Sequence, residues 1–246
     1  MLGLPDATQA CLFDLDGVVT KTALVHAAAW KQMFDGFLRT WAAGHGTEFV
    51  PFDQVREYDQ YVDGKPRLDG TRSFLRARGI ELPEGSPDDP PTAQTINGLS
   101  NCKNALVLDL IESRGVQVYD GSVRYIRAVR AAGLHTAVVS SSANTAQVLT
   151  VAGIAGLFDA RIDGVIAKER GLAGKPAPDT FLAGAKELDV PPSRAVVFED
   201  ALAGVEAGHA GHFGLVVGVN RTGQAQELAA HGADVVVDDL EELLDR

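Results

Sequence analysis

Cysteine and long apolar runs are both scarce in this sequence. Its 246 residues include only two cysteines, Cys11 and Cys102, and their separation fits no metal-binding spacing. Cys11 stands in an apolar run, so we expect a buried, reduced thiol and no disulfide. No apolar stretch is long enough to span a bilayer, and no basic and apolar N-terminal signal is present. We therefore expect a cytoplasmic protein without a membrane partner.

Positive charge is scarce as well. Lys and Arg number 22 against 33 Asp and Glu, which gives a formal net charge of −11. An acidic surface repels the phosphate backbone, so we expect no nucleic-acid partner. If the substrate is an anion, the few cations that hold it must be concentrated in one pocket. We expect a monomer that acts on a small molecule.

The material for a packed core is present, since hydrophobic residues make up 46% of the chain. In the second half, short apolar runs alternate with helical stretches, which predicts an α/β fold. We expect a parallel, Rossmann-like sheet with helices on both faces. The predicted strands are Ala10–Leu15, His135–Val139, Ala195–Phe198, Leu215–Val219 and Asp234–Val237. The predicted helices between them are Gly121–Ala132, Asn144–Ala152, Asp179–Leu188 and Ala201–His209.

Residues 22–112 interrupt this alternation. They contain helical segments at His26–Thr40, Gly70–Arg78 and Ala105–Glu112 and no convincing strand. We therefore predict an all-helical cap, residues 22–112, inserted after the first strand of a catalytic core formed by residues 1–21 and 113–246. The two crossings between cap and core would act as hinges.

Two carboxylates stand at the end of the first predicted strand. Asp14 and Asp16 are two residues apart, so on a strand they would point the same way, and Gly17 lets the backbone turn after them. Both would project at the carboxyl end of the strand, where open α/β sheets bind ligands. One carboxylate can attack phosphorus while the other handles the proton of a hydroxyl. An acidic turn after an edge strand explains this pair, taken alone, equally well.

Three later motifs extend the set. Ser140 stands at a strand-to-helix turn, where a hydroxyl and backbone N–H groups suit phosphate oxygens, although such a serine more often caps a helix. Lys175 lies on a proline-braced loop, whereas a lone lysine is usually solvated. Glu199 and Asp200 end another apolar strand, and carboxylate oxygens are ligands that Mg²⁺ prefers. In this order and spacing the motifs predict a magnesium-dependent phosphoryl-transfer site.

These four motifs resemble, in order, those of the haloacid dehalogenase superfamily, and the resemblance covers essentially the whole chain. It implies that Asp14 is a nucleophile that forms an aspartyl-phosphate and that Asp16 is the general acid and base. Ser140 and Lys175 would hold the transferring phosphoryl group. The implied Mg²⁺ ligands are Asp14, the backbone carbonyl of Asp16, Asp200 and, directly or through water, Glu199.

The second aspartate narrows the reaction. Branches of the superfamily that dehalogenate or cleave C–P bonds lack an aspartate at the position of Asp16, because they need no acid for an alkoxide leaving group. The resemblance therefore leaves phosphate-ester chemistry, which is either hydrolysis or transfer to a second hydroxyl.

The cap favours transfer, because it resembles the β-phosphoglucomutase-like subfamily at residues 22–31 and 62–67 and at Lys103-Asn104. In that subfamily His26 would support Asp16 in catalysis. Arg67, with Ser142 and Asn144, would hold the far phosphate of a sugar bisphosphate through planar, bidentate donors. A mutase needs two phosphate sites because its intermediate must turn round. The implied substrate-binding residues of the cap are Gly64, Arg67, Lys103 and Asn104.

Each cap residue also has a purely structural interpretation. His26 fits a core or surface histidine equally well, Trp30 is more readily a packing residue, and Arg67 could be solvated. Two positions depart from the subfamily. Ala143 stands where a lysine commonly helps to bind the distal phosphate, and Lys21 replaces a residue that is usually acidic.

Three functions remain open on the sequence. The resemblance implies foremost an isomerase that interconverts β-glucose 1-phosphate and glucose 6-phosphate through glucose 1,6-bisphosphate. A phosphatase of sugar phosphates with the same fold is the alternative, which the missing cation at Ala143 slightly favours. A non-catalytic metal- or phosphate-binding module is the third possibility, and the presence of all the motif residues argues against it.

Overall fold

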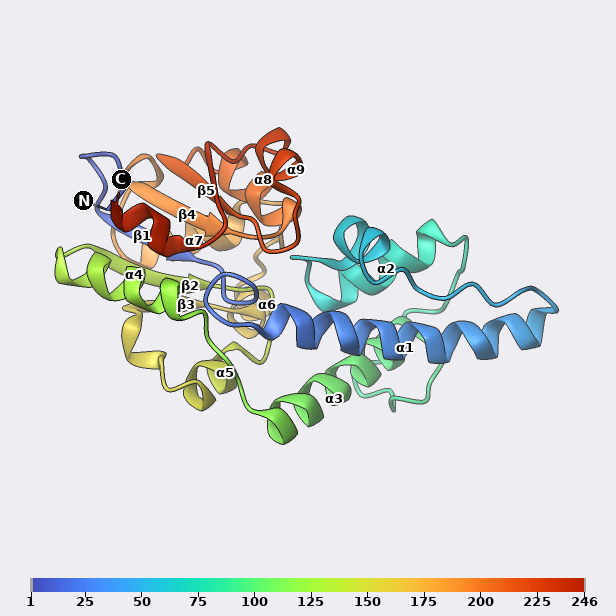
Figure 1. The fold of residues 1–246 in the computed structure, drawn as a ribbon. Coiled ribbons are helices and arrows are strands. Elements are labelled where there is room, and N and C mark those ends of the chain that lie inside the picture. Colours follow the sequence, from blue (N-terminus) through green and yellow to red (C-terminus); the bar gives the residue numbers. More distant parts are fainter. Residues whose placement is uncertain (1, 246) are drawn as a thin grey trace. The chain divides into compact units, whose positions relative to one another are not determined.

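The computed structural model describes residues 2–245 and divides into two compact units (Figure 1). One unit, the core, comprises Met1–Thr22 and Val116–Arg246, and the other, the cap, comprises Ala23–Gly115. The crossings that the sequence placed at 21/22 and 112/113 therefore lie at 22/23 and 115/116. The second crossing is later because helix α3 (Ile96–Arg114) continues to Arg114, where Gly115 follows with a φ of 70°.

Six parallel strands form the sheet of the core, in the order β3-β2-β1-β4-β5-β6. The predicted α/β, Rossmann-like architecture is thereby confirmed. Strand β1 is central, and Phe13 at its end is level with Val138 of β2 and Phe198 of β4. The segments after these three strands therefore emerge at one edge of the sheet. The strands are β1 (Ala10–Phe13), β2 (His135–Val139), β3 (Ala160–Ile162), β4 (Ala195–Glu199), β5 (Leu215–Val219) and β6 (Val235–Val237).

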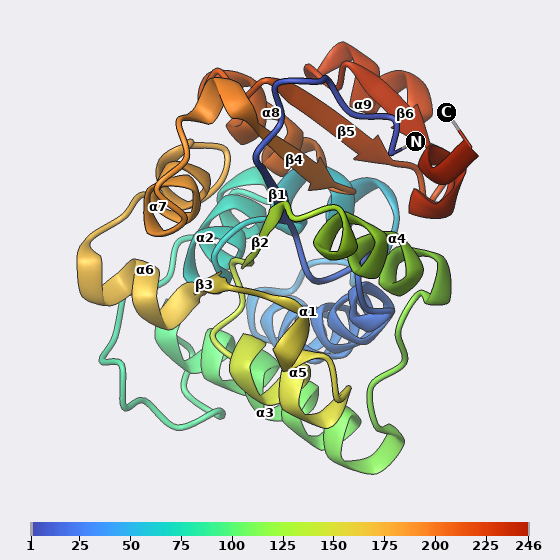
Figure 2. The same cartoon turned by 90° about the vertical axis from the view of Figure 1, so that its left-hand side faces the viewer.

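Helices cover both faces of this sheet (Figure 2). On one face Leu12 belongs to the same buried cluster as Phe181 of α7, and on the other Phe13 stacks on Phe198 at 4.5 Å and meets Tyr125 of α4 edge-on. The side chains of successive residues of β1 thus pack on opposite faces of the sheet, as strand geometry requires. The helices of the core are α4 (Asp120–Ala131), α5 (Thr145–Val151), α6 (Gly164–Arg170), α7 (Asp179–Glu187), α8 (Leu202–Ala210) and α9 (Ala225–Ala230), with 3₁₀ turns at Ala155–Leu157, Pro192–Arg194 and Leu240–Asp245.

Strand β3 and helices α6 and α9 of the core were not predicted. Strand β3 has three residues and the central one, Arg161, is exposed, so the sequence shows no apolar run there. Helix α6 has seven residues, and its start depends on Asp163, whose side chain accepts hydrogen bonds from the amides of Val165 and Ile166.

The cap is helical, and its described residues contain no strand. Its elements are α1 (Thr22–His45), a π-helical turn at Tyr58–Val62, α2 (Arg67–Ala77) and α3. Trp30 is buried and stacks on Phe34 at 5.1 Å, which confirms that it packs in the cap, and Phe34 lies 4.0 Å from Phe74. Helix α3 begins earlier than predicted because Thr95 caps it, accepting a hydrogen bond from the Gly98 amide at 2.9 Å.

Two compositional expectations can be compared with the structure. Cys11 is buried, and both cysteines are free thiols, as expected. Burial raises the pKa of the Cys11 thiol well above its ordinary value. Among residues 2–245, no helix combines the length and the hydropathy that a membrane crossing needs.

Candidate active site

Asp14 and Asp16 follow strand β1 rather than belonging to it. The strand was expected to reach Leu15 but ends at Phe13, although the Asp14 amide still donates to Phe198 O at 2.9 Å. The chain then turns at Gly17, which has a φ of 93° and donates to Thr20 O at 2.7 Å. A Cβ at this position would collide with the Asp200 carboxylate, so only glycine fits this turn.

Lys175 lies between two carboxylates in the buried centre of the site. Its Nζ is 2.5 Å from Asp14 Oδ1, donates to Glu199 Oε1, and is 3.3 Å from Val139 O. The side chain of Lys175 is 1% exposed, and its ammonium also lies 4.8 Å from the centroid of the Phe181 ring. The lysine is therefore a fully engaged internal cation and not the solvated residue that its sequence position alone allowed.

Burial and charge perturb both members of this pair. Desolvation raises the pKa of Asp14 well above its ordinary value, the charges of Glu199 and Asp16 raise it further, and Lys175 opposes them. Desolvation lowers the pKa of Lys175, but the charges of Asp14 and Glu199 outweigh it, so the pKa is raised and the ammonium is retained. The negative charge of the cluster is thus only partly offset by the protein.

Asp16 is held by two hydroxyl groups. Thr22 Oγ1 donates to Asp16 Oδ1, and Ser140 Oγ lies 3.4 Å from Asp16 Oδ2. Thr22 also contacts the hydroxyl of Thr20 at 2.5 Å, and Thr20 Oγ1 donates to Leu15 O at 3.1 Å. These threonines fix the carboxylate of Asp16 in one orientation, which suits a group that must pass a proton to a defined atom.

Ser140 continues strand β2 and starts a loop of side-chain-to-backbone hydrogen bonds. Its amide donates to Ile162 O at 3.0 Å, and its Oγ accepts from the Ser142 amide at 3.1 Å. The Ser142 hydroxyl accepts in turn from the Asn144 amide at 3.2 Å, and α5 begins only at the next residue. Ser140 is therefore not a helix cap, and Ala143 in this loop is exposed.

Three carboxylates can share a cation here. Oxygen atoms of Asp14, Glu199 and Asp200 lie within 4.8 Å of one another, and all three residues are buried. Both oxygens of Glu199 have protein donors, since Oε1 accepts from Lys175 and Oε2 from the Ala201 amide at 2.9 Å. Asp14 and Asp200 are thus the better placed direct ligands. A cluster of buried acids with one lysine has the donor set and the charge that suit Mg²⁺.

The predicted cap residues form two pairs within the cap. Lys103 Nζ of α3 is 2.6 Å from His26 Nδ1 of α1 and 5.0 Å from the centroid of the Trp30 ring. Arg67, in the first turn of α2, donates to Asn104 Oδ1 of α3. Burial lowers the pKa of Arg67, so this arginine is not a solvated one.

The second pair offers further donors. The Nε of Arg67 is buried and has no hydrogen-bond partner among the described residues. Gly64, with a φ of 69°, forms the turn that leads into α2, a position that favours glycine.

Two polar residues of the site were missed. Gln224 donates to Asp200 O at 3.0 Å, and Arg221 donates to Gly17 O at 2.9 Å. Both follow β5 at its carboxyl end, so the rule that located Asp14 and Asp200 also applied to them.

The fold and the site define an α/β protein whose buried carboxylates and Lys175 gather at the carboxyl ends of parallel strands. A model of the haloacid dehalogenase-like hydrolase family matches residues 8–212, and the chain belongs to this family. This confirms the resemblance drawn from the four motifs.

Individual relatives agree with this assignment. The chain is 58% identical to β-phosphoglucomutases of Mycobacterium bovis and Mycobacterium tuberculosis over 247 residues, covering 99% of this chain and 94% of each relative. Its fold resembles a crystal structure of β-phosphoglucomutase from Clostridium difficile, with a TM-score of 0.73 at 25% identity over 96% of this chain and 93% of that one. It also resembles a hydrolase from Pseudomonas syringae, with a TM-score of 0.76 at 21% identity over 97% of both chains.

Proposed function

We propose that this protein is a magnesium-dependent β-phosphoglucomutase, which interconverts β-glucose 1-phosphate and glucose 6-phosphate through glucose 1,6-bisphosphate. The observation that carries the chemistry is the contact of 2.5 Å between Lys175 Nζ and Asp14 Oδ1, in a buried cluster with Glu199. Similarity to the mycobacterial enzymes over 99% of the chain supports the choice of sugar and of isomerisation. We further propose that the protein acts as a monomer in the cytoplasm.

Asp14 and Asp16 divide the reaction between them. An oxygen of Asp14 forms a bond to phosphorus while the bond from phosphorus to the sugar oxygen breaks, and Asp16 gives its proton to that departing oxygen. In the reverse step a sugar hydroxyl attacks the aspartyl-phosphate and gives its proton back to Asp16. The hydrogen bonds from Thr22 and Ser140 hold the Asp16 carboxylate for both steps.

Lys175 and Ser140 would bind the phosphoryl group during transfer. The Lys175 ammonium offsets negative charge that would otherwise repel Asp14 from a phosphate. Asp14, Asp200 and the backbone carbonyl of Asp16 would hold Mg²⁺, with Glu199 acting through water because both of its oxygens already accept hydrogen bonds. When bound, Mg²⁺ would neutralise charge on the phosphoryl oxygens.

A bisphosphate needs donors for its second phosphate. We assign these to Arg67, Lys103 and Asn104 of the cap, next to the turn at Gly64, and to Ser142 and Asn144 of the core. The unpartnered Nε of Arg67 supports this role, because a guanidinium can bind phosphate with two parallel donors. His26, bonded to Lys103, would support Asp16 in catalysis.

Phosphorus NMR tests the proposal directly. The purified protein is incubated with β-glucose 1-phosphate, Mg²⁺ and a trace of glucose 1,6-bisphosphate. We expect glucose 6-phosphate without net release of inorganic phosphate, and no reaction with Asp14→Asn. Stoichiometric release of phosphate without isomerised sugar would reject the mutase assignment.

A sugar-phosphate phosphatase is the second candidate. It is favoured by the exposed, uncharged Ala143 in the loop that follows Ser140, because no cation stands there to bind a second phosphate. Arg67→Ala separates the two functions. A mutase should lose nearly all turnover of the bisphosphate, whereas hydrolysis of a monophosphate should change much less. Arg72→Ala is the matched control, because Arg72 lies on the same helix and pairs with Asp69 and Glu84 at the surface.

A further inference from the structure

Arg221 is a nearly buried arginine that no step of the proposed reaction uses. It follows strand β5, and its side chain is 12% exposed. Its guanidinium lies 3.6 Å from the centroid of the Tyr119 ring, an arrangement in which a cation is attracted to the ring face. The guanidinium also makes five polar contacts, so the position demands a planar group with several donors.

Those donors converge on the turn that follows Asp16. Nε donates to Gly17 O at 2.9 Å, and Nη2 lies 3.4 Å from Val18 O and 3.3 Å from Ser122 Oγ. Ser122 itself donates to Val18 O at 2.6 Å. The two carbonyls directly after Asp16 are therefore both held by side chains from distant parts of the core.

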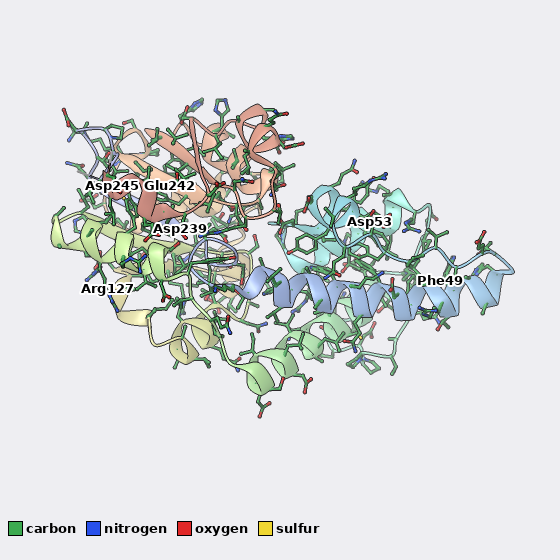
Figure 3. All side chains as sticks on the ribbon, in the orientation of Figure 1. Phe49, Asp53, Arg127, Asp239, Glu242 and Asp245 are labelled. Atoms are coloured by element: carbon green, nitrogen blue, oxygen red, sulfur yellow. The ribbon has the colours of Figure 1, made fainter. Side chains whose placement is uncertain are left out.

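The same guanidinium is anchored on the opposite side. Nη1 donates to Asp238 O at 2.6 Å and lies 3.1 Å from the carboxylate of Asp239, which Figure 3 labels. Arg221 thus links the turn at Gly17–Val18 to the segment after strand β6. Replacing this arginine would leave the carbonyls and the carboxylate that it binds without their donor.

The turn held in this way also leads into the two connections of the core to the cap. Tyr119 N donates to Val19 O at 2.9 Å, and Lys21 N donates to Gln117 O at 2.8 Å, so the outgoing and returning segments pair. Tyr119 contacts Arg221 as described, and the Lys21 ammonium lies 5.5 Å from its ring centroid. The unusual lysine at position 21 therefore lies near the same ring.

We propose that Arg221 is a positioning residue, which fixes the Gly17–Val18 backbone and thereby the orientation of the Asp16 carboxylate and carbonyl. A small shift of this backbone would bring it into the Asp200 carboxylate, because Gly17 lies directly against Asp200. The proposal rests on the proposed function for the identity of the reaction, but not for the role of the turn.

The test compares Arg221→Met with Arg130→Met. Arg130 is a matched control because it also joins helix and loop through several bonds, to Thr136, Leu157 O and Asp159, but at the amino end of β2. For each protein we would measure kcat and KM for p-nitrophenyl phosphate and for β-glucose 1-phosphate. For the same proteins we would also measure thermal unfolding and amide hydrogen exchange, both without ligand.

Arg221→Met should lower kcat by about 10- to 100-fold and change KM by less than about threefold, since a misplaced reacting group costs rate more than binding. The amides of Gly17 and Thr20 should exchange faster, whereas that of Leu12 in β1 should not. Arg221→Lys should recover part of kcat, because one donor and the charge remain. Arg130→Met should keep kcat within about twofold despite a lower Tm.

A kcat that falls equally in both methionine variants, in step with stability, would overturn the positioning role. So would unchanged exchange at Gly17 and Thr20. If Arg221→Met does not fold, Arg221→Lys and Tyr119→Leu are compared with Arg130→Met by the same measurements. If the wild-type protein hydrolyses p-nitrophenyl phosphate but isomerises no sugar, the mutase assignment is rejected and the test of Arg221 still holds. The exchange experiment needs no substrate at all.

Discussion

The ammonium of Lys175 lies 2.5 Å from Asp14 Oδ1 and donates at the same time to Glu199, so one cation serves two buried carboxylates. Asp200 adds a third carboxylate to the cluster. A charge imbalance of this kind is costly inside a protein unless a further cation completes it. The site is therefore arranged to receive the positive charge that a metal ion would bring.

Removing this lysine should affect both activity and stability. Lys175→Met leaves Asp14 and Glu199 without their shared cation, so we expect turnover to fall at least about 10³-fold and unfolding to become easier by about 3 kcal/mol. Phosphoryl transfer and urea unfolding measure the two effects. Lys168→Met, which changes an exposed lysine of α6, should alter neither. Turnover within tenfold of wild type would contradict the role of Lys175.

The turn at Gly17 gives a second prediction. Gly17→Ala and Gly133→Ala both place an alanine at a positive φ, of 93° and 82°, which costs about 1 kcal/mol in each case. Only at Gly17 would the new Cβ collide with Asp200, because Gly133 has open space around it. Gly17→Ala should therefore lose Mg²⁺ affinity, measured by calorimetry, and most of its activity. Equal activity in the two variants would contradict this expectation.

Position 143 tests how the second phosphate is bound. Ala143 is exposed, so a lysine fits there without displacing the core. If Ser142 and Asn144 bind the distal phosphate, Ala143→Lys should lower the KM for glucose 1,6-bisphosphate about fivefold, the effect of one added charge pair near a surface. The KM for p-nitrophenyl phosphate, which has one phosphate, should not change. A parallel change for both substrates would place the new charge at the transferring phosphate instead.

The pair Arg78–Glu57 of the cap gives a prediction about pH, and Asp53 beside it is labelled in Figure 3. Desolvation raises the pKa of Glu57, but the hydrogen bonds from Arg78, at 2.6 and 2.8 Å, outweigh it and hold the pKa below the ordinary 4.5. A lowered folded-state pKa stabilises the protein above about pH 4.5, and this contribution is lost as the pH falls through the folded value.

Glu57→Gln should therefore reduce the free energy of unfolding by about 1 kcal/mol at pH 7 and by much less at pH 3. Urea unfolding at both values measures the difference, with the exposed Glu81→Gln as control. A loss that is equal at the two pH values would mean that packing, and not the ion pair, determines the effect.

The sequence predicted best what is local. Strand β2 and strand β5 have the predicted bounds, and the acids expected at the ends of β1 and β4 do lie together, because each motif lies within a few residues of an apolar run. Elements that depend on single hydrogen bonds were predicted less well. Helix α3 was expected from Ala105 but begins at Ile96, because the cap at Thr95 extends it.

Contacts between distant segments were not predictable in this way. Arg221 bonds Gly17 across 204 positions of the sequence, and Lys103 bonds His26 across 77. Nothing in the periodicity around Arg221 distinguishes it from a solvated arginine. The general rule for strand ends points to it, but only the folded sheet brings its guanidinium to the turn after Asp16.

The central place of β1 in the sheet has a consequence for how the protein is made. Asp14 directly follows β1, yet the strands beside β1 are β2 and β4, which follow the whole of Ala23–Gly115 in the sequence. The inserted unit has its own apolar core and is complete before either neighbour is synthesised. The nascent chain therefore carries Asp14 without its partners until Ala23–Gly115, β2, Lys175 and β4 have been synthesised, so the buried cluster can form only after all of them.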